Sequence, residues 1–369
     1  MSPTQGLPDS QRSRRLAPHL RGLTPAALAG RWRDLPIDIR IARRVTTRLV
    51  ADYADALDDV PGLSRRLAGE LARRARWPRL RILDRRASLA DPFVKYLFEA
   101  QDGVRYEAVR IPLERPRWSI CVSSQAGCPL GCRFCATGRL GFARNLEAWE
   151  MVDQVLAIRA ESRERPVTGV VFQGQGEPLL NYENVLAAVA VLRDPCGGRI
   201  GADRITLSTV GVPRLIERYT DERHPYRLIL SLTSTRDDRR GEVIPPARGA
   251  SVKDLAEAVR RHALARHAPV HIAWVLIRGF NTGPEEAEGL RRLFPGVAVR
   301  VSLIDVNDAT GRYVAPADEE RARFQSALAA NGLAFIRRYS GGSDIGASCG
   351  TLASTCHGGR TVPAAAEPG

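Results

Sequence analysis

Four of the seven cysteines in the chain lie within one short segment, 119-SICVSSQAGCPLGCRFCATG-138. Cys128, Cys132 and Cys135 have a C-x3-C-x2-C spacing, and the glycines and proline around them indicate a loop. Three thiolates this close can converge on one metal centre. A structural zinc needs a fourth protein ligand, whereas a catalytic zinc with three protein ligands and a water remains an alternative. A four-iron cluster held by three thiolates leaves one iron free for a substrate, and this spacing favours it.

The remaining cysteines divide into two groups. Cys121 lies in an apolar run seven residues before Cys128, and Cys349 lies in a loop between small residues. A lone cysteine on a strand is usually a small core residue, but the end of this strand must face the cysteine loop. The glycines around Cys349 permit close approach to a substrate. We expect no role for Cys196 or Cys356.

Short apolar runs alternate with helical patterns from residue 118 onwards. The expected strands are 118–123, 168–174, 204–209, 226–232, 270–277 and 298–304. Expected helices include 147–161, 183–193, 251–266 and 317–331. Strand–helix alternation implies parallel strands with crossover helices. The predicted fold class is therefore α/β, a partial (β/α)6 barrel with its site at the carboxyl ends of the strands.

The rest of the chain suggests a domain plan around this barrel. The sequence predicts six segments: a disordered 1–15, a small basic helical domain over 16–90, connecting strands over 91–117, the barrel over 118–310, a C-terminal extension over 311–356, and a disordered tail over 357–369. Thr24 followed by a proline predicts a helix start.

The net charge of +14 is unevenly distributed. Residues 1–90 contain 19 arginines and no lysine against 9 acidic residues. With 53 arginines and only two lysines, the chain has a bias for arginine over lysine, but that bias does not explain the excess of bases over acids. A basic field of this size suits a polyanion such as RNA.

No segment has the pattern of a secretion signal, and no apolar run approaches about 18 residues. These features predict a cytoplasmic protein without a membrane partner. A reducing compartment disfavours a disulfide framework, so clustered cysteines there indicate metal binding or catalysis.

Four motifs in order give the sequence a specific resemblance. The C-x3-C-x2-C loop after the first barrel strand resembles that of the radical S-adenosylmethionine (SAM) superfamily. The segments ICVSSQAGCPLGCRFCATGRLGFARNL, QGQGEPL, RITLSTVGV and DIGASCGTLA resemble the RlmN/Cfr family, radical SAM methyltransferases of ribosomal RNA adenine. The resemblance covers roughly residues 25–356 and includes an N-terminal domain that contacts RNA in the family.

The resemblance implies roles for five residues. Cys128, Cys132 and Cys135 would hold one [4Fe–4S] cluster with an iron open to SAM. Cys349 would carry a methyl group and then a crosslink to an adenine carbon, C2 or C8. Cys121 would release the product through a transient disulfide with Cys349.

Further residues and partners follow from the same resemblance. Glu107 matches the proposed proton acceptor. The matching SAM contacts are Gly176, Glu177, Ser208, Ser231, Leu232, Thr233 and Asn307. Two SAM molecules would be used per turnover, with flavodoxin or ferredoxin as electron donor, and the substrate would be ribosomal RNA or tRNA.

Three segments depart from the family pattern. Thr233 replaces a usual histidine, Asn307 lacks its usual flanking prolines, and the glycine segment is QGQGEP. These departures predict a divergent member, with another RNA as its target. Two alternatives are a radical SAM enzyme for a small molecule or peptide, and a non-enzymatic RNA-binding iron–sulfur protein.

Overall fold

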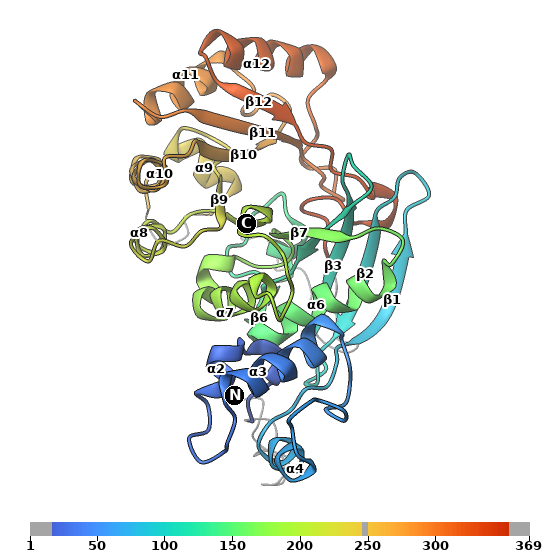
Figure 1. Ribbon diagram of the computed structural model, residues 1–369. Helices are drawn as coiled ribbons and strands as arrows, with labels where there is room; N and C mark the ends of the chain where they lie inside the picture. The colour runs from blue at the N-terminus through green and yellow to red at the C-terminus, as the bar shows by residue number, and fades with distance from the viewer. Residues whose placement is uncertain (1–16, 246–249, 354–369) are drawn as a thin grey trace.

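A computed structural model describes residues 17–245 and 250–353 (Figure 1). The predicted disordered segments 1–15 and 357–369 and Cys356 lie outside these ranges. The described chain begins with short helices, which are η1 (Leu20–Gly22), α2 (Pro25–Ala29), α3 (Ile39–Thr46), the π-helical turn η2 (Thr47–Ala51) and α4 (Arg65–Arg74). The Thr24 side chain accepts a hydrogen bond from the backbone of Ala27, so the predicted helix start is confirmed.

One ten-stranded sheet organises the rest of the fold. Its order is β1-β2-β3-β4-β7-β8-β9-β10-β11-β12. The antiparallel part is β1 (Arg81–Ala87), β2 (Val94–Glu99), β3 (Arg105–Pro112) and β4 (Trp118–Val122). The parallel part continues from β4 through β7 (Val167–Phe172), β8 (Ile205–Thr209), β9 (Arg227–Ser231), β10 (Val270–Leu276), β11 (Val299–Asp305) and β12 (Ala334–Arg337).

The predicted partial barrel is confirmed as an open α/β sheet, since the linear strand order ends at β1 and β12. All six predicted strands are present, and β12 adds a seventh parallel strand that was not predicted. Within residues 16–90 the helices end at Arg74, and β1 already belongs to the sheet.

Crossover helices cover the outside of the parallel strands (Figure 1). They are α6 (Ala148–Glu161), α7 (Tyr182–Arg193), α8 (Pro213–Asp221), α9 (Asp237–Val243), α10 (Val252–Arg266), α11 (Pro284–Leu293) and α12 (Asp318–Ala330), with short turns η3 (Pro178–Asn181), η4 (Ala202–Arg204) and η5 (Ser343–Ile345). Their apolar faces and the strands form the main core. No helix in the described ranges is long and apolar enough to cross a bilayer.

The N-terminal lobe, which comprises the helices from η1 to α4, is attached to α6 by a buried arginine. The Arg21 guanidinium donates to the carbonyls of Leu49 (3.1 Å) and Ala54 (2.8 Å) and lies 3.8 Å from the Asp153 carboxylate on α6. Burial raises the pKa of Asp153 to about 6, and the charge of Arg21 opposes this shift. This buried ion pair fixes the lobe against the barrel.

Candidate active site

A single cavity lies at the carboxyl edge of the parallel strands and contains most of the predicted site. Its empty volume is about 1340 Å³, counting the part open to solvent. Predicted residues in its wall are Cys121, Cys128, Cys132, Cys135, Gly176, Glu177, Ser208, Ser231, Asn307 and Cys349. The edge at which parallel strands end is where sites of α/β folds gather.

Close backbone contacts shape the cysteine loop. Gly127 has φ +75°, and a Cβ there would lie 2.0 Å from the carbonyl oxygen of Gly141, so only glycine fits. This contact closes the hairpin of β5 (Gln125–Gly127) and β6 (Phe142–Asn145). Gly138 lies in α5 (Ala136–Arg139), and a Cβ there would lie 2.7 Å from the Cys132 nitrogen. The loop is therefore folded tightly around its thiols.

The three clustered thiols influence one another. Burial raises the pKa of Cys132, and the charges of Cys135 and Cys128 raise it further. Within the described ranges, no three Cys, His, Asp or Glu side chains are grouped so as to hold one metal ion. A four-iron cluster makes a different demand, because each of its thiolates binds a separate iron. The cavity wall contains these thiols and no histidine, and such a donor set fits an iron–sulfur cluster.

Glu177 brings a negative charge into the same cavity. Its carboxylate accepts hydrogen bonds from the backbone N–H groups of Leu179 (2.9 Å) and Val210 (2.8 Å). Burial raises the pKa of Glu177, and these bonds oppose the shift. Gly176 has φ +101°, and its Cβ would lie 2.5 Å from that of Gln125, so glycine is required beside the carboxylate.

Two predicted cofactor contacts lie away from the cavity wall. Leu232 continues the face of β9 that carries Leu230, and it is fully buried. Ser231 points to the opposite face, into the cavity, as the two-residue period of a strand requires. Thr233 has φ +66°, is fully buried, and its hydroxyl has no hydrogen-bond partner among the described residues.

Cys121 and Cys349 reach the cavity from distant parts of the chain. Cys121 lies in β4, and Cys349 lies in the loop after η5, where its N–H donates to the Ser340 hydroxyl at 2.8 Å. Burial raises the pKa of Cys121 to about 12; the charge of Cys349 raises it too, and the charge of Arg338 opposes the shift. The two sulfurs are therefore close enough for the charge of Cys349 to affect the pKa of Cys121, and both are free thiols in this structure.

The Cys349 loop is attached directly to the cluster loop. The N–H of Ala136, the first residue of α5, donates to the Gly350 carbonyl at 2.7 Å. The Thr137 hydroxyl donates to the Leu352 carbonyl at 2.8 Å. These bonds hold the distant cysteine against the wall that contains Cys135.

Glu107 does not line this cavity. Its carboxylate lies 3.0 Å from the Lys95 ammonium and accepts a hydrogen bond from the Ala353 N–H at 2.8 Å. It contributes instead to a smaller pocket with Arg105 and Ala353. In this structure the carboxylate contacts the segment that follows the Cys349 loop.

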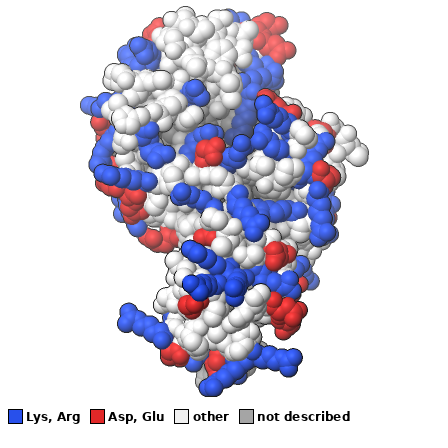
Figure 2. Space-filling view, in the orientation of Figure 1, with Lys and Arg blue, Asp and Glu red and all other residues white. Residues whose placement is uncertain are grey.

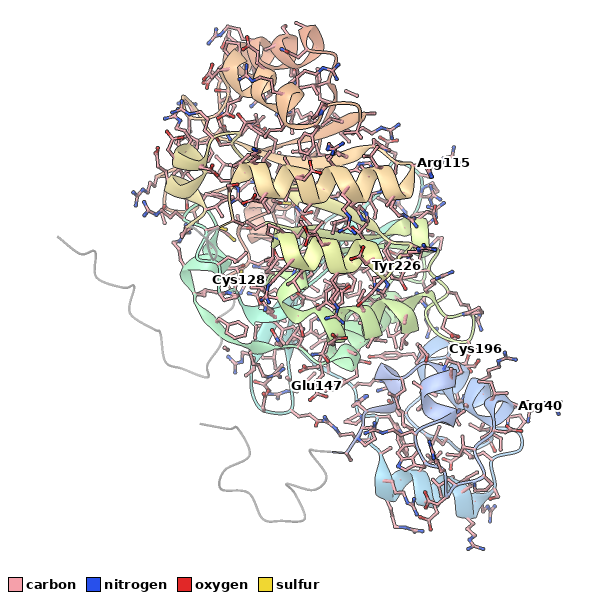
Figure 3. The ribbon with its side chains drawn as sticks, turned by 90° about the vertical axis from the view of Figure 1, so that its left-hand side faces the viewer. Arg40, Arg115, Cys128, Glu147, Cys196 and Tyr226 are labelled. Carbon is pink, nitrogen blue, oxygen red and sulfur yellow. The ribbon has the colours of Figure 1, made fainter. Side chains whose placement is uncertain are left out.

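Sequence reasoning missed Gln173, Arg338 and Tyr339, which all line the cavity. Arg338 donates to the Gln173 side chain at 2.8 Å, and both follow strand ends. Only the position after a strand could have indicated them. Cys196 lies far from the labelled Cys128 in Figure 3, in a loop where its N–H donates to Asp194.

The parallel sheet with three clustered cysteines at its carboxyl edge defines a radical SAM domain. The family model for the Radical SAM superfamily matches residues 122–293. Membership implies a [4Fe–4S] cluster and SAM as cofactors.

Relatives that match along most of the chain identify the family within this superfamily. A Myxococcus xanthus protein named "Probable RNA methyltransferase" is 46% identical over 328 residues, covering 88% of this chain and 91% of its own length. A Pseudothermotoga lettingae protein named "Probable dual-specificity RNA methyltransferase RlmN" is 38% identical, covering 74% and 79%. A radical SAM methyltransferase from Sphaerobacter thermophilus has a crystal structure that matches with a TM-score of 0.84 and 35% identity, covering 91% and 99%. The chain belongs to the RlmN/Cfr family of radical SAM methyltransferases.

Proposed function

We propose that the protein methylates an adenine carbon, C2 or C8, in RNA. Large-subunit ribosomal RNA is the expected substrate, and tRNA is a second. The observation that carries this proposal is that Cys121 and Cys349 line one cavity together with Cys128, Cys132 and Cys135. The names of the relatives support RNA as the substrate class.

The cofactors would be held by residues of the cavity wall. Cys128, Cys132 and Cys135 would hold the [4Fe–4S] cluster, and SAM would contact Gly176, Glu177, Ser208, Ser231 and Asn307. When bound, the cluster and two SAM molecules supply a methyl group and a carbon-centred radical that removes hydrogen from it. An electron donor such as flavodoxin or ferredoxin would reduce the cluster.

A thiol that carries the methyl group is needed because adenine C2 is electrophilic. The electrophilic methyl group of SAM cannot react with it by ordinary polar transfer, whereas a carbon radical attached to sulfur can. Cys349 would therefore lose its thiol proton, accept the methyl group, and carry the carbon that bonds to the base.

The resulting crosslink would be broken by Cys121. Its thiolate attacks the Cys349 sulfur, a sulfur–sulfur bond forms, and the bond from that sulfur to the product carbon breaks. The carbon keeps the electron pair and takes a proton, and the disulfide must be reduced by an external thiol before the next turnover. Before this step the adduct of the carbon radical must lose one electron, which the cluster would take back when bound, and the proton on the base carbon, which Glu107 is proposed to accept. Since Glu107 now contacts Ala353, this role needs a movement of the 349–353 segment.

The N-terminal lobe supplies positive charge for RNA. Figure 2 shows basic side chains projecting from this lobe, where all of them are arginines, and across the middle of the same face. Arg43, Arg44 and Arg48 line one surface pocket together with Asp52 and Asp59. Within the described ranges none of these three arginines forms an ion pair with an acid, although Arg44 donates to the Pro61 carbonyl at 2.7 Å. Arg43 and Arg44 are exposed and Arg48 is half-buried, so we expect this cluster to attract phosphates.

The alternatives are a different RNA substrate or a small molecule or peptide. Deleting residues 1–90 would not separate them cleanly, because the deletion removes β1 from the sheet and Arg21 from Asp153. Replacing Arg43, Arg44 and Arg48 by glutamine keeps β1 in the sheet and Arg21 beside Asp153. It should weaken action on RNA and leave SAM cleavage intact, with a denaturant melt as the check on folding.

The direct test uses total RNA from a strain of the source organism that lacks the gene. This RNA is incubated with reconstituted enzyme, SAM and reductant under anaerobic conditions, and its nucleosides are analysed by mass spectrometry. We expect one methylated adenosine, with the methyl group on carbon. SAM cleavage without any modified nucleoside would favour the small-molecule alternative.

A further inference from the structure

Tyr339 is an exposed aromatic residue in the wall of the active-site cavity. Its side chain lines the cavity with Cys349, yet the residue is 70% exposed. It follows β12 by two positions, so its place is set by the sheet. Burying an aromatic ring is favourable, so a large ring left exposed in the same cavity wall as Cys349 can gain free energy by stacking on a partner.

The Tyr339 ring is held in position from its rim. Its hydroxyl donates to the Asp91 carboxylate at 2.8 Å, and that carboxylate also accepts the Gly342 N–H at 2.8 Å. The Phe93 ring meets Tyr339 edge-on, with centroids 6.0 Å apart and planes at 73°. The hydroxyl is engaged and one edge is packed, so the open part of the ring is available for stacking without further ordering.

The same loop connects Tyr339 to the reacting sulfur. Ser340, the next residue, accepts the N–H of Cys349 at 2.8 Å, and the Ser348 hydroxyl donates to the Ser340 carbonyl at 3.0 Å. The aromatic ring and the thiol therefore belong to one hydrogen-bonded unit. A group stacked on the ring would lie at the mouth of the cavity that contains Cys349.

We propose that Tyr339 is the stacking platform for an RNA base that has left its helix on the way to Cys349. This inference rests on the proposed function. A base must be unstacked before chemistry on its ring carbons, and an aromatic side chain replaces part of the lost stacking. Because the hydroxyl of Tyr339 is bonded to Asp91, the residue positions the base by its face and does not read the edge that distinguishes adenine.

The test compares two substitutions at this position in the full-length, anaerobically reconstituted enzyme. Tyr339→Phe keeps the ring and loses the bond to Asp91, whereas Tyr339→Leu loses the ring. Leu264→Ala is the control for loss of an exposed apolar side chain, because Leu264 is 47% exposed, lies on α10 and is outside the cavity wall. The substrate is total RNA from the strain that lacks the gene.

Steady-state methylation and photocrosslinking are the two measurements. Removing a stacked aromatic weakens binding by about 5- to 150-fold, so we expect Tyr339→Leu to raise KM by that factor with a smaller change in kcat. Tyr339→Phe and Leu264→Ala should stay within about threefold of the wild type. Irradiation at short wavelength should attach a nucleotide to the peptide containing Tyr339, identified by mass spectrometry.

The outcomes separate this inference from the proposed function. Wild-type methylation with an unchanged KM for Tyr339→Leu would overturn the platform alone. Equal losses for Tyr339→Phe and Tyr339→Leu would assign the effect to the bond with Asp91, and would also overturn it. If the wild-type enzyme cleaves SAM but neither methylates RNA nor crosslinks to it, the proposed function and the platform both fail.

Discussion

The most informative perturbation is the removal of the Cys121 thiol. Cys121 lies in β4 and shares a cavity wall with Cys349. Without its sulfur, nothing in the proposed scheme breaks the bond between Cys349 and the base. We therefore expect Cys121→Ala protein to remain covalently attached to RNA after a single turnover.

The structure also predicts how the release step depends on pH. Burial raises the pKa of Cys121 from 9.0 to about 12. Only the thiolate attacks sulfur, and burial, the largest cause of the raised pKa, persists when Cys349 is alkylated, so the thiolate is a small fraction of Cys121 at neutral pH. The release rate should therefore rise about tenfold for each pH unit between pH 7 and pH 9.

Alkylation of Cys349 should favour the attack by Cys121 on the Cys349 sulfur. The charge of Cys349 is the second cause of the raised pKa of Cys121. A thioether carries no charge, so alkylation of Cys349 removes that cause and makes the Cys121 thiolate easier to form. Arg338 opposes the shift, so Arg338→Gln should slow release while crosslinking still occurs.

The assay is a single turnover with labelled RNA, quenched with acid at several pH values and analysed on denaturing gels. Cys196→Ala is the control, because Cys196 lies in a loop outside the cavity wall. Recovery of RNA-free, competent Cys121→Ala enzyme would refute the reasoning. A release rate that levels off near pH 8.5 would show that Cys121 behaves as an ordinary exposed thiol.

Three further predictions concern cofactor binding, RNA binding and stability. Glu177→Gln replaces a charged acceptor of two backbone N–H groups with an amide, so SAM affinity measured by calorimetry should fall about 10- to 100-fold while iron content stays the same. Replacing Arg43, Arg44 and Arg48 with glutamine should lower RNA affinity in filter-binding measurements. The slope of log K against log salt concentration should become shallower by about two to three. Replacing Arg73 and Arg74 with glutamine is the control, because both already pair with acids. Asp153→Ala leaves the Arg21 guanidinium buried beside Asp55 alone, so denaturant melts should show a loss of about 3–5 kcal/mol, and an unchanged midpoint would contradict a structural role for this pair.

Most of the barrel was predictable because its signals are local. An apolar run of six to eight residues between turns indicates a buried strand, and all six such runs contain strands. The cluster loop was predictable from cysteine and glycine spacing alone. β12 was not predicted because it is a short and largely exposed strand. Its pairing with β11 depends on how α12 packs, and the local sequence does not indicate that packing.

Side-chain direction was the part that sequence did not supply. The motif placed Ser231, Leu232 and Thr233 together, but only Ser231 lines the cavity. Leu232 points to the opposite face from Ser231, and Thr233 lies beyond the end of β9 with φ +66°. Arg338 and Tyr339 belong to no motif, and they reach the site only because β12 joins the sheet beside β11. The contact of Glu107 with Ala353 depends on how a loop 246 positions away folds back.

The central claim is that the methyl carbon reaches RNA through Cys349 and a radical. It is tested most directly with SAM whose methyl group carries three deuterium atoms. If a radical removes one hydrogen before the carbon joins the base, the methylated adenosine should contain two of the three deuterium atoms in its mass spectrum. A product that retains all three would indicate direct polar transfer, and it would contradict the account.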